Sequence, residues 1–295
     1  MKLLTNPFTN NPKLMTNPAA QRNLDTLIRL AIAEDLEGGD LATRAIIPQT
    51  TQATALISAK ADGVISGVEV ARQVIDTMGQ NTFTPLVQDG DRIAKGQRLI
   101  QIEGRYDLLL SAERTMLNFL QRMSGIATRT AQIVSLLQGT KCRLLDTRKT
   151  APGHRFTDKL AVRHGGGVNH RMGLYDMAML KDNHLKAAGG VIPAVQAARR
   201  VLPISVKIEV ETATLEQVTE ALQAGADIIM LDNMSHEMMR RAVAMIDGRV
   251  PVEASGNITD ANAAQVAATG VDYISIGALT HSVTALDMSM NFVLK

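Results

Sequence analysis

From residue 141 onward, short apolar runs alternate with amphipathic segments, and this alternation restricts the fold more than any other feature of the sequence. Alternating strands and helices imply parallel strands joined by right-handed helical crossovers. The apolar runs are CRLLDT, MAMLKD, ISVKIEVET, DIIMLDN, VPVEASGN and VDYISIGA. The segments between them are FTDKLAVRHG, VIPAVQAARRVL, LEQVTEALQAG, HEMMRRAVAMID and NAAQVAATG. Six runs are too few for a closed eight-stranded barrel, so we expect an open (incomplete) (β/α) barrel with room for one strand that the pattern does not reveal.

Residues 50–110 have a different pattern. The runs TQATALISAK, DGVISG and QRLIQIEG predict strands separated by Gly-Asp turns, and VEVARQVIDTM predicts one helix among them. Strands that recur without a helix between each pair are typical of a small sheet with helices on one face. A further helix is expected over 19–37. The residues before it carry Asn-Pro pairs and predict an irregular lead-in over 1–20.

Residues 111–138 predict helical structure with a break near Ser124-Gly125. Ser111 is expected to start this helix, with Glu113 in its first turn. Arg114 is either a solvated helix residue or a ligand-binding group. Its spacing alone favours the solvated interpretation.

Basic side chains gather in one part of the chain although the whole is nearly neutral. The net charge is +2, from 31 basic and 29 acidic side chains, which excludes general nucleic-acid binding because that requires a marked basic excess. Cations at the ends of apolar runs predict a pocket for a small anion with several negative charges, whereas a solvated loop would scatter them. The gathered residues are Arg148 and Lys149 after CRLLDT, His170 and Arg171 after three glycines, and Lys181 after MAML.

The single cysteine, Cys142, cannot form an intrachain disulfide, which fits a reducing compartment. We interpret it as a core residue. No segment has the ~18 uncharged apolar residues of a membrane span, and the first residues lack the apolar stretch of a signal peptide. We therefore expect a cytoplasmic protein without membrane contact.

Polar residues follow the apolar runs, at the strand ends where parallel barrels place their active sites. The last two runs lead into SGNIT and IGALTH, small turns whose backbone N–H groups suit a phosphate at a helix N-terminus. We expect a phosphate cradle there, with His281 as a side-chain donor. The cradle residues are Ser255, Gly256, Asn257, Gly277 and Ala278.

Glu211 and Asp232 end neighbouring strands and are expected to face the cationic site. Paired carboxylates of this kind suit Mg²⁺, which completes its shell with water and phosphate oxygens. They also suit ribose hydroxyls or a cationic sugar carbon. A third interpretation is that they pair with Lys181 and Lys149 to balance charge.

Several segments resemble the quinolinate phosphoribosyltransferase family, also called carboxylating nicotinate-nucleotide pyrophosphorylases. The matching segments are SAERTMLNFLQRMSGIAT, DTRKTAPGHR, GGGVNHRMGLYDMAMLKDNH, IIMLDN, EASGNI and ISIGALTHS, and the match runs from about Ile32 to the C-terminus. The resemblance implies an N-terminal α/β sandwich domain over 21–124 and an open barrel with a seventh strand over 125–295. The C-terminal tail would pack back on the N-terminal domain. It also implies a homodimer, in which the partner's N-terminal domain completes each active site.

The resemblance also implies roles for individual residues. Arg114 would reach the partner's site. The two carboxylates of quinolinate would be held by Arg148, Lys149, His170 and Arg171. The pyrophosphate of phosphoribosyl pyrophosphate would contact Lys149 and Lys181. Glu211 and Asp232 match the ribose and Mg²⁺ carboxylates, and Ser255, Gly256, Gly277 and His281 match the 5′-phosphate site. Thr147, Asn257, Ile276 and Ala278 complete the expected substrate-binding set. The expected catalytic residues are Lys149, Lys181, Glu211 and Asp232. Ala151 and His154 depart from the family's more frequent Thr and Leu.

The implied reaction joins quinolinate to the phosphoribosyl group and gives nicotinate mononucleotide, pyrophosphate and CO₂. It needs no organic cofactor, because the positive ring nitrogen of the product stabilises the carbanion left by decarboxylation. Nearby carboxylates would stabilise the oxocarbenium-like sugar carbon.

Other classes of function compete with this one. A lyase or isomerase of the same architecture would use Lys181 or Lys207 as a Schiff base. A non-catalytic nucleotide-binding protein on this fold would not need the complete charged set. A closer alternative is a phosphoribosyltransferase-like paralogue associated with molybdenum transport, with a different acceptor; the presence of both Arg148 and Arg171 favours a dicarboxylate.

Overall fold

The computed structural model describes residues 18–295, so most of the lead-in expected over 1–20 lies outside the described residues. The chain divides into two compact units. Within the described residues, unit 1 comprises 18–131, 150–166 and 279–295, and unit 2 comprises 132–149 and 167–278. No helix in the described part of the chain is long and apolar enough to cross a membrane.

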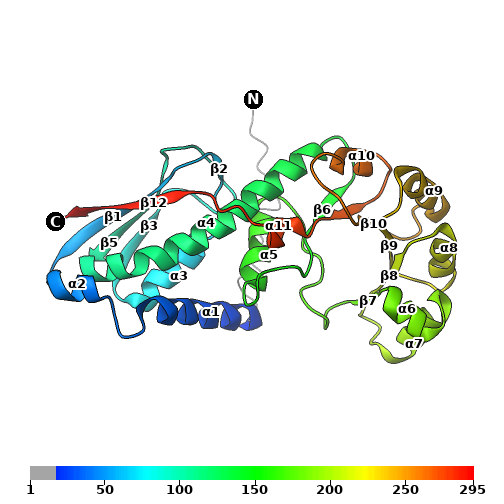
Figure 1. Ribbon diagram of the computed structural model, residues 1–295, viewed down its shortest axis with the longest axis horizontal. Coiled ribbons are helices and arrows are strands. Elements are labelled where there is room, and N and C mark those ends of the chain that lie inside the picture. Colours follow the sequence, from blue (N-terminus) through cyan, green and yellow to red (C-terminus); the bar gives the residue numbers. More distant parts are fainter. Residues whose placement is uncertain (1–17) are drawn as a thin grey trace. The chain divides into compact units, whose positions relative to one another are not determined.

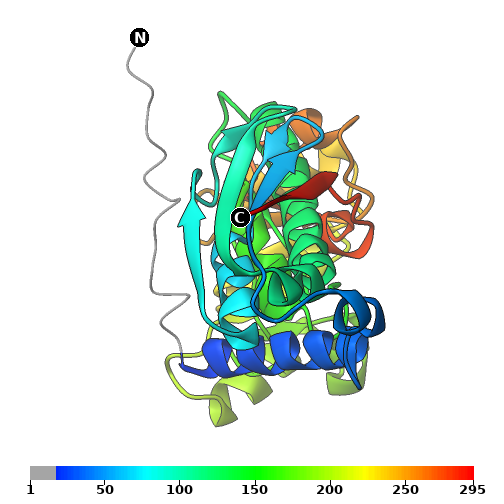
Figure 2. The ribbon, with the colours of Figure 1, turned by 90° about the vertical axis from the view of Figure 1, so that its left-hand side faces the viewer.

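Unit 1 contains an antiparallel sheet in the order β12-β1-β5-β3 (Figure 2). Its strands are β1 (Gln52–Ala59), β3 (Asn81–Pro85), β5 (Arg98–Arg105) and β12 (Met288–Leu294). A two-stranded ribbon adds β2 (Gly63–Val64) and β4 (Arg92–Ile93). Alternate residues of β1 are buried, as expected for a strand with one face in a core. The sequence runs predicted as strands here are β1, β2 and β5, and the C-terminal strand β12 pairs with β1 along its whole length.

The helices of unit 1 pack on this sheet and on each other. They are α1 (Pro18–Leu36), α2 (Leu41–Ile46), α3 (Val68–Met78), the first part of α4 (Tyr106–Leu136) and α5 (Arg155–His164). Helix α5 was expected as a crossover helix of the barrel but belongs to unit 1. The reason is a buried ion pair: the Arg122 guanidinium of α4 donates to both carboxylate oxygens of Asp158 at 2.9 and 2.8 Å.

Helix α4 is continuous, so the predicted break near Ser124-Gly125 is wrong. The predicted start at Ser111 is also wrong, because the helix begins at Tyr106. The small residues serve packing instead. A Cβ on Gly125 would lie 2.1 Å from the backbone oxygen of Thr284, and the buried Ser124 hydroxyl accepts a hydrogen bond from the Ser66 amide at 2.9 Å. In a sequence, small residues such as Ser124 and Gly125 suggest a helix break. Here they instead allow another backbone segment to approach the helix closely.

Unit 2 contains a parallel sheet in the order β6-β11-β10-β9-β8-β7, with helices along its outer side (Figure 1). The strands are β6 (Arg143–Leu145), β7 (Ala178–Leu180), β8 (Ile208–Thr212), β9 (Ile228–Asp232), β10 (Val252–Ser255) and β11 (Tyr273–Ser275). The helices are α6 (Asp182–Ala188), α7 (Val191–Val201), α8 (Leu215–Gln223), α9 (His236–Ile246) and α10 (Ala263–Ala267), and the short α11 (Ala278–His281) crosses into unit 1. The six strands match the six predicted runs, and from β7 onward the helices of unit 2 follow the predicted alternation.

The barrel is open, as predicted, because β6 and β7 form the two edges of the sheet and are not paired with each other in the described chain. The expected seventh strand is reduced to one parallel bridge between Val168 and Leu145 of β6. Backbone bonds hold it: the Val168 amide donates to the Leu144 carbonyl at 2.8 Å. Three glycines precede Val168, so this segment has no side-chain pattern by which the sequence could reveal a strand.

We predict that Gly125→Ala lowers the free energy of unfolding by about 2 kcal/mol, because the new methyl group meets backbone that must move. The gain in helix propensity from Gly to Ala, about 1 kcal/mol, only partly offsets this. Denaturant unfolding measures the change. Gly38→Ala is the matched control, since a Cβ there has nothing within 4 Å. Equal stability of the two variants would contradict the packing role of Gly125.

Candidate active site

The candidate site of unit 2 is built on one face of the parallel sheet, and burial divides its acidic residues into an upper and a lower layer. Paired residues of neighbouring parallel strands point to the same side. Glu211 of β8 and Glu253 of β10 are both paired with Met230 of β9, and Ser255 is paired with Asp232. Glu211 and Glu253 therefore lie level with each other, and Asp232 and Ser255 lie nearer the strand ends. Asp232, Ser255 and the more exposed Glu211 are called the upper layer.

The lower layer comprises the two buried carboxylates, Glu209 and Glu253. Glu209 stands two residues before Glu211 on the same strand, and Glu253 stands two residues before Ser255. A spacing of two residues keeps the side chains on one face. Burial separates the layers: the side chains of Glu209 and Glu253 are 0% and 2% exposed, whereas that of Glu211 is 16% exposed.

In the upper layer, Lys181 and Glu211 form an ion pair of 3.0 Å between Nζ and Oε2. Lys181 follows β7 directly, and α6 starts after it, with the Lys181 amide donating to Nδ1 of His184 at 3.0 Å. The ammonium is exposed and paired with a carboxylate, not enclosed in the apolar pocket that activates a Schiff-base lysine. Lys207 is exposed as well. The geometry therefore disfavours the Schiff-base alternative.

Three residues of the predicted phosphate cradle, Ser255, Gly256 and Asn257, lie in a turn beside Asp232. Asn233 donates to Asp232 Oδ2 at 2.9 Å, and its own Oδ1 accepts from Asn257 Nδ2 at 3.0 Å. Gly256 has φ of +94°, and a Cβ there would lie 2.2 Å from Asn233 Oδ1. Only glycine fits at this position. Asn233, which was not among the predicted site residues, thus links the carboxylate to the cradle.

The second half of the cradle is less open than the sequence suggested. The amide of Ile276 donates to the Leu145 carbonyl at 3.1 Å, so this N–H is used within the sheet. Gly277 and Ala278 follow at the end of unit 2, and α11 is a helix of only four residues. His281 belongs to unit 1, where its Nδ1 lies 2.7 Å from the Ser282 hydroxyl.

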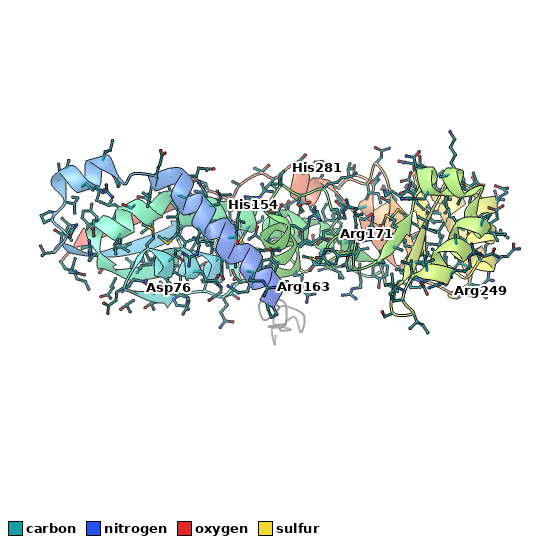
Figure 3. The ribbon with its side chains drawn as sticks, turned by 90° about the horizontal axis from the view of Figure 1, so that it is seen from below. Asp76, His154, Arg163, Arg171, Arg249 and His281 are labelled. Carbon is teal, nitrogen blue, oxygen red and sulfur yellow. The ribbon has the colours of Figure 1, made fainter. Side chains whose placement is uncertain are left out.

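The cationic residues occupy the loop after β6 and the segment after Val168. The Thr147 hydroxyl accepts from the Lys149 amide at 3.0 Å and shapes the first loop, in which Arg148 and Lys149 are exposed. Arg171, labelled in Figure 3, donates from its guanidinium to the Met177 carbonyl at 3.0 Å. Burial and then the positive charge of Arg148 lower the pKa of Arg171. Two guanidinium groups that repel each other are suited to hold an anion between them.

Asp146, at the end of β6, orients the second cationic segment. Its side chain is fully buried and accepts from the His170 amide at 2.9 Å and from Asn169 Nδ2 at 2.5 Å. This carboxylate was seen at a strand end in the sequence but was not assigned to the site. Its role is to fix the backbone from which His170 and Arg171 project.

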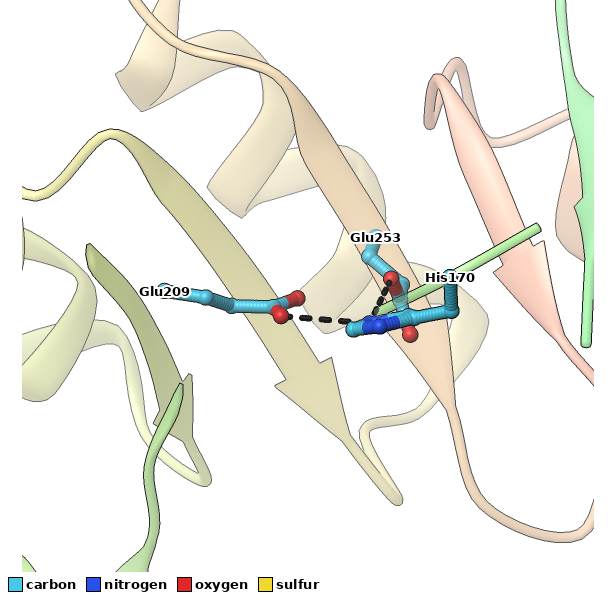
Figure 4. A group of neighbouring side chains, drawn as sticks. All are labelled: His170, Glu209 and Glu253. Atoms are coloured by element: carbon cyan, nitrogen blue, oxygen red, sulfur yellow. Dashed lines mark ion pairs between the residues drawn. The ribbon is translucent and has the colours of Figure 1, made fainter. Parts of the chain in front are cut away.

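The His170 ring lies between the two lower-layer carboxylates (Figure 4). Its Nε2 is 3.2 Å from Glu209 Oε2 and 3.3 Å from Glu253 Oε2. Burial opposes the charge on the ring, but the two carboxylates outweigh it and raise the pKa of His170 to about 9. Burial first, and then the nearby Glu253, raise the pKa of Glu209 despite the opposing effect of His170. These three residues also form a group that could hold a metal ion, with ligand atoms within 4.8 Å of one another. The predicted pair Glu211 and Asp232 is not part of that group.

The Nδ1 atom of His170 lies 2.7 Å from the amide nitrogen of Arg171. That contact is a hydrogen bond only when Nδ1 carries no proton, whereas the carboxylates favour a ring protonated on both nitrogens. Two buried negative charges next to one ring outweigh a single backbone contact, so the ring carries its positive charge.

Arg114 and His281 are the two predicted site residues outside unit 2. Arg114 lies on α4 and is exposed, which agrees with a solvated side chain within its own unit. The remaining predicted residues come together in unit 2: Thr147, Arg148, Lys149, His170, Arg171, Lys181, Glu211, Asp232, Ser255, Gly256, Asn257, Ile276, Gly277 and Ala278.

Unit 1 has a Ser/His/Asp set that does not form a nucleophilic triad. Ser66 Oγ is 2.8 Å from Nδ1 of His164, and Asp89 approaches the same nitrogen at 4.0 Å. A catalytic triad needs the acid on one ring nitrogen and the hydroxyl on the other. Ser66 is also fully buried, so this set carries no acyl-transfer chemistry.

Comparison with known proteins accounts for both units. The description "Quinolinate phosphoribosyl transferase, N-terminal domain" matches residues 40–124, and the corresponding C-terminal domain matches residues 126–291. The chain belongs to the quinolinate phosphoribosyltransferase family.

Full-length relatives in this family are similar throughout. A nicotinate-nucleotide pyrophosphorylase [carboxylating] of Mycobacterium leprae is 45% identical over 271 residues, which are 90% of this chain and 95% of the relative. A probable enzyme of the same name from Bacillus subtilis is 42% identical, covering 92% of this chain and 94% of the relative. The crystal structure of NadC from Streptococcus pyogenes aligns with a TM-score of 0.89 at 41% identity, covering 92% and 97% of the two chains. The resemblance seen in the sequence motifs, and the fold class drawn from it, are thereby confirmed.

We predict that the His170 ring remains protonated up to about pH 9, well above the ordinary value near 6.5. The charge is present below that pH and is lost as pH rises through it. Imidazole NMR titration measures this directly, and His170→Asn identifies the signal among the six histidines. A midpoint near 6.5 would contradict the pairing with Glu209 and Glu253.

Proposed function

We propose that this chain transfers the phosphoribosyl group of phosphoribosyl pyrophosphate to quinolinate, with decarboxylation to nicotinate mononucleotide. The observation that carries the proposal is that unit 2 contains both a pair of carboxylates at the ends of neighbouring strands and a pair of guanidinium groups close enough to influence each other. The upper-layer carboxylates Glu211 and Asp232 suit a developing cation, and the coupled guanidinium groups of Arg148 and Arg171 suit a dicarboxylate. The names of the related enzymes support the same reaction.

Quinolinate would be held by cations on two segments. Arg148 and Lys149 come from the loop after β6, and Arg171 comes from the segment that Asp146 orients. Both carboxylates of the substrate are charged in the ground state, so these contacts act mainly on binding. They also place the ring nitrogen toward the sugar carbon, which is the orientation that the displacement requires.

At the sugar, the residues of the upper layer would act. The ring nitrogen forms a bond to the anomeric carbon while the bond from that carbon to pyrophosphate breaks, and its electron pair leaves with pyrophosphate. Glu211 and Asp232 stabilise positive charge on the sugar carbon, and Lys181 and Lys149 neutralise the leaving group. The cradle of Ser255, Gly256 and Asn257, shaped by Asn233, receives the 5′-phosphate.

The donor set fits a magnesium ion. Glu211 and Asp232 offer hard carboxylate oxygens from adjacent strands, and each has a single close partner with which an ion would compete, Lys181 and Asn233. Mg²⁺ bound there supplies positive charge to the pyrophosphate oxygens. These two carboxylates, not the His170 group, are the proposed ligands.

Decarboxylation requires no further group from the protein. In the quaternised product the bond between the ring and the carboxylate next to the nitrogen breaks, CO₂ leaves, and the electron pair stays on the ring carbon. The adjacent positive nitrogen stabilises that carbanion until it takes up a proton. No organic cofactor is proposed for this reason.

The proposed assembly is a homodimer with shared active sites, in which Arg114 of the N-terminal domain completes the partner's site. The exposure of Arg114 on α4 supports this, because an exposed guanidinium is available to a second subunit. The proposed domains are 21–124 and 125–295. A cytoplasmic location is proposed with them, on the single buried Cys142.

A substrate panel with pyrophosphate release as the readout tests the proposed reaction. We expect turnover of quinolinate that stops on chelation and returns with Mg²⁺. Nicotinate should have a kcat/KM lower by about 10³-fold or more, because it lacks one of the two carboxylates that the cations of the site would hold. Equal turnover of nicotinate would contradict the proposal.

The shared site is tested by mixing two inactive variants. If Arg114 acts in the partner's site, Arg114→Ala and Lys181→Ala damage one site from different subunits, and each homodimer should be nearly inactive. A mixed dimer has one site with both changes and one site with neither, so the purified heterodimer should show about half the wild-type rate. Random reassortment of equal amounts should return about a quarter. A folded heterodimer that is as inactive as its parents would show that Arg114 acts within its own subunit or outside the site.

A further inference from the structure

The proposed reaction assigns no role to the two lower-layer carboxylates, Glu209 and Glu253. Glu209 and Glu253 are buried below the residues that meet the sugar, and their side chains are at most 2% exposed. Both oxygens of Glu209 and one of Glu253 have no hydrogen-bond partner among the described residues. Buried carboxylates without such partners are costly, so this arrangement is not explained by stability.

The position of His170 indicates what the carboxylates do. Its backbone is tied to the edge strand β6 through Asp146, whereas its ring reaches Glu209 on β8 and Glu253 on β10 (Figure 4). The ring therefore connects the segment after Val168 to the middle of the sheet. The bridge at Val168 and the bonds to Asp146 join this segment to the edge of the sheet, and the buried contact of the ring adds an anchor in the middle of the sheet.

Arg171 follows His170 directly and depends on this anchor. Its amide lies against the His170 ring, and Glu209 also offsets the repulsion from Arg148 by stabilising the positive charge of Arg171. A site that collects several cations repels itself before substrate arrives. Two negative charges beneath the cations allow Arg171 to be held in place in the empty enzyme, which lowers the cost of binding.

We propose that Glu209 and Glu253 are positioning residues of the quinolinate subsite, which act through His170 to hold Arg171 in its binding position. This inference rests on the proposed function. It assigns to these two carboxylates an effect on quinolinate binding and none on the sugar chemistry of the upper layer. The distances from His170 Nε2 to Glu209 and Glu253, 3.2 and 3.3 Å, are those of direct ion pairs. The test below distinguishes such pairs from a metal ion bound to the same three residues.

The test compares Glu209→Gln, Glu253→Gln and the exposed control Glu237→Gln, which makes the same chemical change on α9. Gln keeps the shape of Glu, so the fold should be retained, and circular dichroism and thermal unfolding verify this. We expect each buried variant to raise the KM for quinolinate by about tenfold, the size expected for one lost charge-assisted contact. The kcat and the KM for phosphoribosyl pyrophosphate should stay within about twofold. The control should match the wild type.

A double-mutant cycle with Arg171→Ala tests whether the effect passes through that residue. In the Arg171→Ala background, Glu209→Gln should change the KM for quinolinate by less than about threefold, because the group that it positions is gone. Fully additive effects would overturn the proposal, as would a loss confined to kcat. If Glu209→Gln does not fold, the same cycle with Glu253→Gln decides.

Two further outcomes are distinguished. Stoichiometric metal in the purified wild type that is absent from Glu209→Gln would assign the group to an ion and overturn the positioning role. If the wild type does not turn over quinolinate, the proposed function fails. If the wild type is active and the Gln variants match it, only the present inference fails.

Discussion

The candidate site depends on charge compensation within a parallel sheet whose strands are otherwise apolar. Residues such as Ile208, Val210 and Ile229 are fully buried, and Glu209 stands among them with no exposed surface. A carboxylate in that environment needs a positive neighbour, and the sheet supplies none. The segment after Val168 brings one in the form of His170. The same contact that satisfies the carboxylate holds the loop from which Arg171 projects, so the interior charge and the binding surface are coupled.

The sequence predicted the strands of the open barrel well because their apolar runs alternate with amphipathic helices at regular intervals. It also predicted which polar residues end the strands, and unit 2 brings most of them to one face. It did not separate Glu209 from Glu211, because a spacing of two residues gives the face of a strand but not the depth of a side chain. Burial follows from what packs over each side chain, which is a property of the assembled sheet.

Other errors of prediction have equally local causes. Ser124 and Gly125 resemble a helix break, but their small size serves a close approach of the backbone at Thr284. Helix α5 has the amphipathic pattern of a crossover helix, but it packs in unit 1, where Arg122 and Asp158 form an ion pair. Neither partner of that pair is marked in the sequence. Long-range contacts decide such cases, and a local pattern does not contain them.

The two layers also differ in how easily their ion pairs can exchange partners. Lys181 and Glu211 form an exposed pair, with side chains 47% and 16% exposed, and such pairs contribute about 0–1 kcal/mol. In the proposed reaction, pyrophosphate can therefore replace Glu211 as the partner of Lys181, and a metal ion or ribose can replace Lys181 as the partner of Glu211. Each exchange costs little free energy, because both charges have a partner before and after it. The pair of His170 with Glu209 is buried, with side chains 8% and 0% exposed, and breaking it would leave a buried charge. Exchangeable pairs at the strand ends and a fixed pair beneath them are what a site needs if it is to release pyrophosphate without losing the geometry that holds the acceptor.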